Sequence, residues 1–134
     1  MSVDYFKYLK HLYDNNEISP ASKVILDDYL LDIKLANLKQ GTVDYHIKIM
    51  IFVTHNVEHD LDKLTVRDVK LFQEKLQNSH YSQSVQKVYT IGFRRFLKWY
   101  SKNSEYKNRR TYLNLLDSFV KRKYNIPKKH LQIF

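Results

Sequence analysis

The chain has 134 residues, of which 43% are hydrophobic and 14% aromatic, so it can fill one core and global disorder is excluded. The absence of cysteine excludes disulfides and thiolate metal sites, and the presence of only two glycines and two prolines disfavours a turn-rich sheet. The net charge of +9 is uneven, since residues 1–60 carry six Lys and Arg against nine Asp and Glu, whereas residues 61–134 carry seventeen against five. Such asymmetry indicates a directional electrostatic surface rather than general solubility.

Three helices are expected in the first half of the chain. Apolar residues at helical spacing predict the first over residues 3–14. Ser19 followed by Pro20 predicts the start of the second, which runs to about Leu35, because serine caps helices and proline fits the first turn. Gly41 opens the third. The positions expected to face inward are Val24, Ile25, Tyr29, Leu30 and Ile33 in the second helix and Val43, Ile47, Met50, Ile51 and Thr54 in the third.

Three more helices are expected in the second half. A capping box, in which the Thr65 hydroxyl and the Asp68 carboxylate bind free backbone amides, starts the fourth helix. Ser82 or Ser84 caps the fifth. The fourth helix is expected to end at about residue 78, the fifth at 101, and the sixth to span about 110–124. The expected inward residues are Val66, Val69, Phe72 and Leu76, then Val85, Val88, Tyr89, Gly92, Phe96 and Trp99, then Tyr112, Leu115, Leu116 and Phe119.

The polar face of the fifth helix is the first candidate for DNA binding. Glutamine and arginine can pair with base edges, and lysine and serine suit phosphates. The candidate residues are Ser84, Gln86, Lys87, Arg94, Arg95 and Lys98. Two alternatives stand beside this hypothesis: the face is simply solvated, or its arginines brace acidic residues of the first half.

The start of the third helix is the second candidate. Its residues are Lys39, Gln40, Thr42 and His46. A helix N-terminus attracts phosphate through its free amides and dipole, although Asp44 weighs against this here. Basic clusters also occur at 107–110, 121–123 and 128–129. They fit two interpretations equally well, a tether along a DNA backbone and a linker that only increases solubility.

Other classes of function find little support. The six histidines form no convincing metal set, and no nucleophile elbow, phosphate-binding glycine loop or Ser/His/Asp arrangement is recognisable. The longest strictly apolar run, Ile49–Val53, is far shorter than a membrane span, and no secretory signal is visible. We therefore expect no cofactor, no small-molecule ligand and no membrane partner, and a cytoplasmic, nucleoid-associated location.

An ordered set of short motifs runs from about Ser22 to Tyr100, across about 80 of the 134 residues. The set comprises Tyr29-Leu30, then Gly41-Thr42-Val43 with Phe52, then Leu61-Asp62-Lys63-Leu64-Thr65-Val66-Arg67-Asp68-Val69 with Phe72, then Tyr81-Ser82-Gln83-Ser84-Val85, and finally Phe93-Arg94-Arg95-Phe96-Leu97-Lys98-Trp99-Tyr100. In this order and spacing the segment resembles the N-terminal core-binding (SAM-like) domain of tyrosine recombinases of the phage-integrase family.

This resemblance implies an all-α fold, an orthogonal bundle of four to five helices with an additional N-terminal helix. The implied organisation is an N-terminal arm over 1–18, a DNA-binding domain over 19–125 and the start of a linker over 126–134. In that family the domain forms one jaw of a clamp around duplex DNA near the crossover site. Its second and fourth core helices, here the Thr42 and Ser84 helices, face the major groove. The implied partners are double-stranded DNA and other protomers bound to it.

The family's catalytic residues are not assembled in this chain. They are an arginine, a lysine, a His-x-x-Arg pair and a tyrosine, and no histidine here is followed at the third position by arginine. A catalytic domain of about 150 residues would be expected beyond the linker, on ordinary domain sizes. We therefore expect no catalysis by this chain, which is either a fragment or a naturally short relative.

Three alternatives remain open. The chain could be a helical protein–protein module whose basic face meets an acidic partner, or a stand-alone DNA-binding regulator of a mobile element. A stable dimer would favour the regulator, because paired half-sites need two-fold symmetry. A free-standing enzyme is the last alternative.

Overall fold

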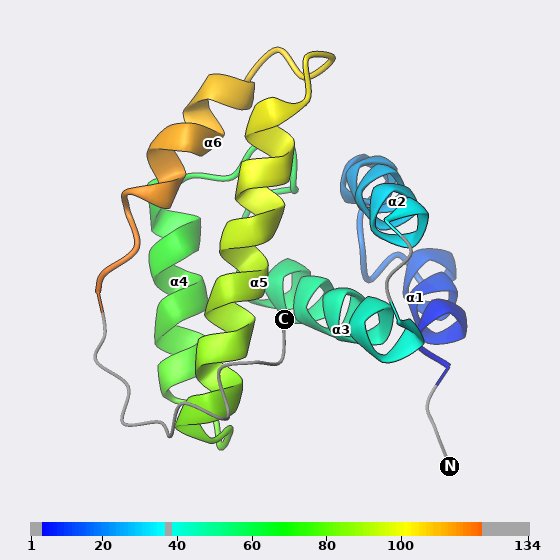
Figure 1. Cartoon of the computed structure of the whole chain (residues 1–134), viewed down its shortest axis with the longest axis horizontal. Helices are drawn as coiled ribbons and strands as arrows, with labels where there is room; N and C mark the ends of the chain where they lie inside the picture. Colours follow the sequence, from blue (N-terminus) through cyan, green and yellow to red (C-terminus); the bar gives the residue numbers. More distant parts are fainter. Residues whose placement is uncertain (1–3, 37–38, 122–134) are drawn as a thin grey trace. The chain divides into compact units, whose positions relative to one another are not determined.

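The computed structural model describes residues 4–36 and 39–121, and this part of the chain contains helices and no strand (Figure 1). The helices are α1 (Tyr5–Asp14), α2 (Pro20–Leu35), α3 (Gln40–Asn56), α4 (Val66–Gln77), α5 (Gln83–Lys102) and α6 (Arg109–Leu116). The prediction of an all-α fold is confirmed. Among the described residues no helix has the length and apolarity needed to cross a membrane.

The helices fall into two compact units, with the boundary between Lys63 and Leu64. The first unit contains α1, α2 and α3, and the second contains α4, α5 and α6. This boundary lies inside the range 19–125 that the sequence predicted as one domain. It also leaves α1, predicted as part of a separate arm over 1–18, within the first unit, where α1 packs on α3.

The predicted capping residues start three of the helices. The side chains of Ser19 and Ser82 each accept a hydrogen bond of 3.2 Å from the backbone amide three residues further on. Pro20 occupies the first turn of α2. The capping box of α4 is complete, because Thr65 Oγ1 accepts from the Asp68 amide at 3.3 Å while the Asp68 carboxylate accepts from the Thr65 amide at 2.9 Å. The predicted starts of these three helices are therefore confirmed.

The core of the first unit is aliphatic around a buried tyrosine. Leu12, Leu26, Tyr29 and Ile47 are at most 1% exposed. Val24, which the sequence placed on the inner face of α2, is 60% exposed, so that prediction is wrong. Leu26 is buried in its stead, because at 100° per residue it shares an arc of α2 with Tyr29, whereas Val24 lies nearly opposite.

The core of the second unit is aromatic and centred on α5. Phe93, which the sequence analysis missed, is fully buried, with its ring 4.7 Å from that of Phe72 and 5.7 Å from that of Phe119. Tyr100 stacks on Tyr112 with 3.8 Å between ring centroids. Val66 in α4 and Trp99 in α5 were also expected to face inward. They are 44% exposed and half-buried respectively, so the second unit covers less of α4 and of the end of α5 than periodicity predicted.

Helix α6 is shorter than predicted. It ends at Leu116, whereas the sequence predicted a helix over 110–124; residues 122–124 lie outside the described residues. Side chains from other helices bind the backbone where α6 stops: Arg94 Nη1 donates to the Leu116 carbonyl at 2.8 Å. The Gln73 side chain donates to the Val120 carbonyl at 2.9 Å and accepts from its amide at 3.0 Å. These tertiary hydrogen bonds replace the helical ones beyond Leu116.

Candidate nucleic-acid interface

The described part of the second unit is strongly basic. Residues 64–121 contain twelve Lys and Arg against four Asp and Glu. In the first unit, residues 1–63 contain seven against ten. The charge asymmetry seen along the sequence is therefore an asymmetry between the two units.

Helix α5 carries five of these twelve cations on one face, here called the basic stripe: Lys87, Arg94, Arg95, Lys98 and Lys102. Lys87, Arg94 and Lys98 follow one another at i, i+7 and i+11, which places them within about 40° of one another around the helix axis. The stripe extends for about 22 Å, since fifteen residues separate its ends and each contributes about 1.5 Å. Lys102 was not among the predicted residues, although its spacing of four from Lys98 could have revealed it.

The cations of the stripe differ in exposure. Arg95, Lys98 and Lys102 are exposed, whereas Lys87 and Arg94 are half-buried. Lysine and arginine in such positions keep their apolar stems against the helix and their charged ends towards water. Ser84, also predicted, is half-buried one turn before the stripe.

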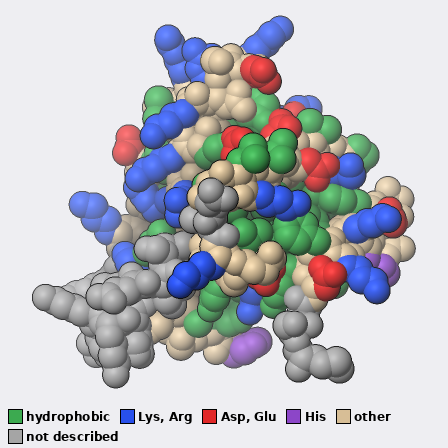
Figure 2. Space-filling view, turned by 45° about the vertical axis from the view of Figure 1, so that its right-hand side comes forward, with side chains coloured by type: hydrophobic (Ala, Val, Ile, Leu, Met, Phe, Trp, Pro, Cys, Tyr) green, Lys and Arg blue, Asp and Glu red, His purple; other side chains and the backbone are tan. Residues whose placement is uncertain are grey.

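A second group of cations lies where α5 turns into α6. We call Lys107, Arg109 and Arg110 the turn cluster; the one acidic residue between Lys102 and Arg110 is Glu105. This turn is at the top of Figure 1, and Lys and Arg side chains project from the corresponding top edge in Figure 2. The sequence left residues 107–110 as either part of a tether or a solubilising linker; the structure places them on a turn and the first residues of α6.

Two predicted DNA contacts are inconsistent with the structure. Gln86 is 4% exposed, and its side-chain amide donates to the Tyr81 carbonyl at 2.9 Å. His46 is 1% exposed, and its Nδ1 lies 3.2 Å from the hydroxyl of the buried Tyr29. Because each side chain is committed to the interior of its own unit, neither can reach a base edge.

The other predicted residues at the start of α3 remain on the surface of the first unit. Lys39 and Gln40 are exposed and Thr42 is half-buried. Lys39 is the N-cap residue but makes no side-chain capping bond, and Gln40 donates to the Asp44 carboxylate at 2.9 Å. The structure thus brings together the α5 residues on one helix face, while these three belong to the other unit, where Gln40 is bonded to a carboxylate.

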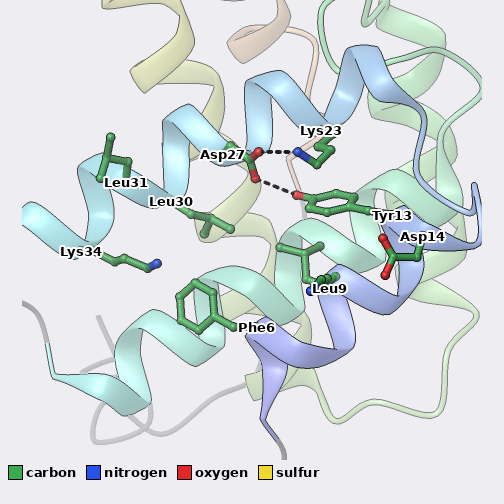
Figure 3. A pocket seen from close by; sticks show the side chains of 10 residues that line it. Phe6, Leu9, Tyr13, Asp14, Lys23, Asp27, Leu30, Leu31 and Lys34 are labelled. Carbon is green, nitrogen blue, oxygen red and sulfur yellow. Dashed lines mark hydrogen bonds and ion pairs between the residues drawn. The ribbon is translucent and has the colours of Figure 1, made fainter.

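The first unit has a groove between α1 and α2 that sequence reasoning did not anticipate (Figure 3). It has a volume of about 530 Å³, and its lining includes Phe6 and Leu30. At one end the Tyr13 hydroxyl donates to Asp27 at 3.3 Å, and Lys23 pairs with the same carboxylate at 3.1 Å. Burial, and then the adjacent Asp27 carboxylate, raise the pKa of Tyr13 well above its usual range.

Three exposed apolar residues lie on α2, and one of them, Leu31, also lines this groove. Val24, Leu31 and Leu35 are 60%, 55% and 72% exposed, and their spacing of seven and four places them on one face. Among the described residues, no three His, Cys, Asp or Glu side chains lie close enough together to hold a metal ion.

No protein-family model matches the chain, and neither a curated protein nor a solved structure matches it. The assignment of function therefore depends on the chemistry of the surfaces described above.

Proposed function

We propose that this chain is a DNA-binding module that holds the backbone of duplex DNA against the basic stripe of α5 and the adjoining turn cluster. The observation that carries the proposal is the alignment of cations along α5, in a unit whose described residues, 64–121, include twelve basic and four acidic ones. Each phosphate neutralised by lysine or arginine releases counterions, which favours binding and makes it sensitive to salt.

The dimensions of α5 support this proposal. The stripe's length of about 22 Å corresponds to about six base-pair steps of 3.4 Å. A helix with its side chains, about 10–12 Å across, fits the major groove, which is about 12 Å wide. Since Gln86 is buried, the exposed members of the stripe are Lys98 and Lys102, which suit phosphates, and Arg95, whose donors suit either a phosphate or a guanine edge.

The resemblance to recombinase core-binding domains suggests a wider role for the proposed binding of duplex DNA. In that role the module is one jaw of a clamp that positions DNA for recombination or integration. In that role cleavage is left to a separate catalytic domain, and other protomers on the same DNA are further partners.

The proposal is tested by fluorescence anisotropy with a labelled duplex of about 30 base pairs at several salt concentrations, where the logarithm of affinity should fall linearly with that of salt. Reversing two exposed charges, Arg95→Glu with Lys98→Glu, should weaken binding at low salt at least about tenfold and lower the slope by about two. The matched control is Lys7→Glu with Lys10→Glu, an equal change of charge at exposed positions of α1, and it should leave the slope unchanged. Absence of binding at low salt, or equal effects of the two double variants, would refute the proposal.

A second candidate function, a stand-alone regulator that acts as a dimer, is favoured by the exposed apolar row on α2. A second copy of the chain would bury Val24, Leu31 and Leu35, which otherwise face water. Sedimentation equilibrium decides between the candidates: a stable dimer that Leu31→Ser with Leu35→Ser converts to monomer would support the regulator, and a monomer at all concentrations would exclude it.

A further inference from the structure

A groove of about 440 Å³ lies in the second unit, between α4, α5 and the segment that follows α6. Three cations line it, Lys87 and Arg94 from α5 and Lys121 from the segment, against one carboxylate, that of Asp117. An excess of cations at a hollow formed by three separate parts of the chain is typical of a site for an anion.

Arg94 is held in place at this groove by contacts on two sides. Its Nη1 donates to the Leu116 carbonyl at 2.8 Å, and its guanidinium carbon lies 5.2 Å from the centre of the Phe119 ring. The carbonyl belongs to the last residue of α6, where the helix dipole is negative and stabilises the guanidinium. Arginine has five N–H donors in a planar fork, so one bond to a carbonyl orients the group and leaves further donors for a ligand.

The far wall of the groove is fixed by Gln73. Its side chain both donates to and accepts from the backbone of Val120, at 2.9 and 3.0 Å. Because Lys121 directly follows Val120, this pair of bonds keeps the exposed Lys121 at the rim of the groove that Arg94 and Lys87 line.

We propose that this groove binds a phosphate group, with the oriented guanidinium of Arg94 as the principal donor and the ammonium groups of Lys87 and Lys121 as flanking charges. The inference rests on the proposed function, in which the group is one phosphodiester of the DNA backbone at the edge of the basic stripe. Arginine suits this task because its donors match two phosphate oxygens at once.

The first experiment titrates inorganic phosphate into the intact protein and follows backbone amides and the Arg94 Nε–H by NMR. Saturable shifts at Arg94, Val120 and Lys121 are expected in the wild type, and they should be absent or much weaker in Lys87→Met and in Arg94→Gln. Chloride at the same ionic strength is the control. Equal shifts with chloride and phosphate would overturn the inference.

The second experiment measures the salt dependence of duplex binding for Arg94→Gln and for Lys121→Met. Each should lower the slope by about one, because each removes one phosphate contact. Arg94→Gln removes a contact to α6 and could unfold the unit, so its thermal unfolding is compared with the wild type. Because Lys121 is exposed, Lys121→Met should leave the unit folded, and it therefore tests the inference even if Arg94→Gln unfolds.

The two experiments separate failure of the inference from failure of the proposed function. If the wild type binds duplex DNA and both variants keep its slope, the groove is not the phosphate site and the proposed function survives. If phosphate shifts the groove signals but duplex DNA does not bind, the anion site survives and its phosphate comes from another source.

Discussion

Single side chains decide which of the polar residues of α5 and α3 can meet a phosphate. Arg95 and Lys98 are exposed, but Gln86 and His46 are buried within their own units. A buried amide or imidazole must be hydrogen-bonded, and the bonds of these two, to the Tyr81 carbonyl and the Tyr29 hydroxyl, are made to the chain itself. Residue type indicated that all four could bind nucleic acid; burial separates them into two groups.

The variant Tyr13→Phe tests a contribution to stability that depends on pH. Burial and the Asp27 carboxylate raise the pKa of Tyr13, so the folded state holds the phenolic proton more tightly than the unfolded state does. This contribution is fully present below the unfolded pKa of about 10 and is lost as the pH rises towards the folded pKa. At pH 7 the free energy of unfolding of the variant should be lower by about 0.5–1.5 kcal/mol, because the hydrogen bond to Asp27 is lost.

Urea unfolding of both proteins between pH 7 and pH 11 measures this effect. The wild type should lose its advantage progressively above about pH 10. The two proteins differ at this one side chain, so the difference between their stabilities isolates Tyr13. A difference that stays constant up to pH 11 would contradict the prediction.

At the scale of the elements, the hydrogen bonds that start the helices join residues close in sequence, whereas those at the end of α6 join distant residues. The side chains that cap α2, α4 and α5 are those of Ser19, Thr65 and Ser82. Each binds an amide only three residues away, so a short stretch of sequence contains both partners. The end of α6 depends instead on Gln73 and Arg94, which lie 47 and 22 residues from the groups they bind. Apolar periodicity could not show these partners.

The capping box gives a prediction at this scale. Thr65→Ala removes the hydroxyl that accepts from the Asp68 amide, and it should lower the free energy of unfolding by about 1 kcal/mol. Thr65→Ser retains the hydroxyl and should recover most of this loss. Equilibrium unfolding in urea, with helicity followed by circular dichroism, compares the three proteins. Equal stability of the alanine and serine variants would show that the hydroxyl does not stabilise α4.

At the scale of the whole molecule, the two units have opposite charge. The second unit holds sixteen of the 23 Lys and Arg residues of the chain, and the first holds ten of its 14 Asp and Glu residues. A polyanion is attracted to the former and repelled by the latter, most strongly at low salt.

Lysine acetylation with and without duplex DNA tests this division in the intact chain. Bound DNA should shield Lys98, Lys102 and Lys107 in the second unit, whereas Lys7 and Lys10 in the first should react at the same rate with and without DNA. Mass spectrometry of proteolytic peptides measures each rate, and the lysines of the first unit serve as internal controls. Uniform protection across both units would contradict a binding surface confined to the second.

The sequence alone determined that this chain is helical, where α2, α4 and α5 begin, and that positive charge concentrates in its second half. Capping and composition act within a few residues, so they can be read from the order of residues. Tertiary structure decided that Gln86 and His46 are buried, that Arg94 turns towards the end of α6, and that α6 stops at Leu116. These outcomes depend on packing and hydrogen bonds between residues distant in sequence, and such contacts exist only once the helices have come together.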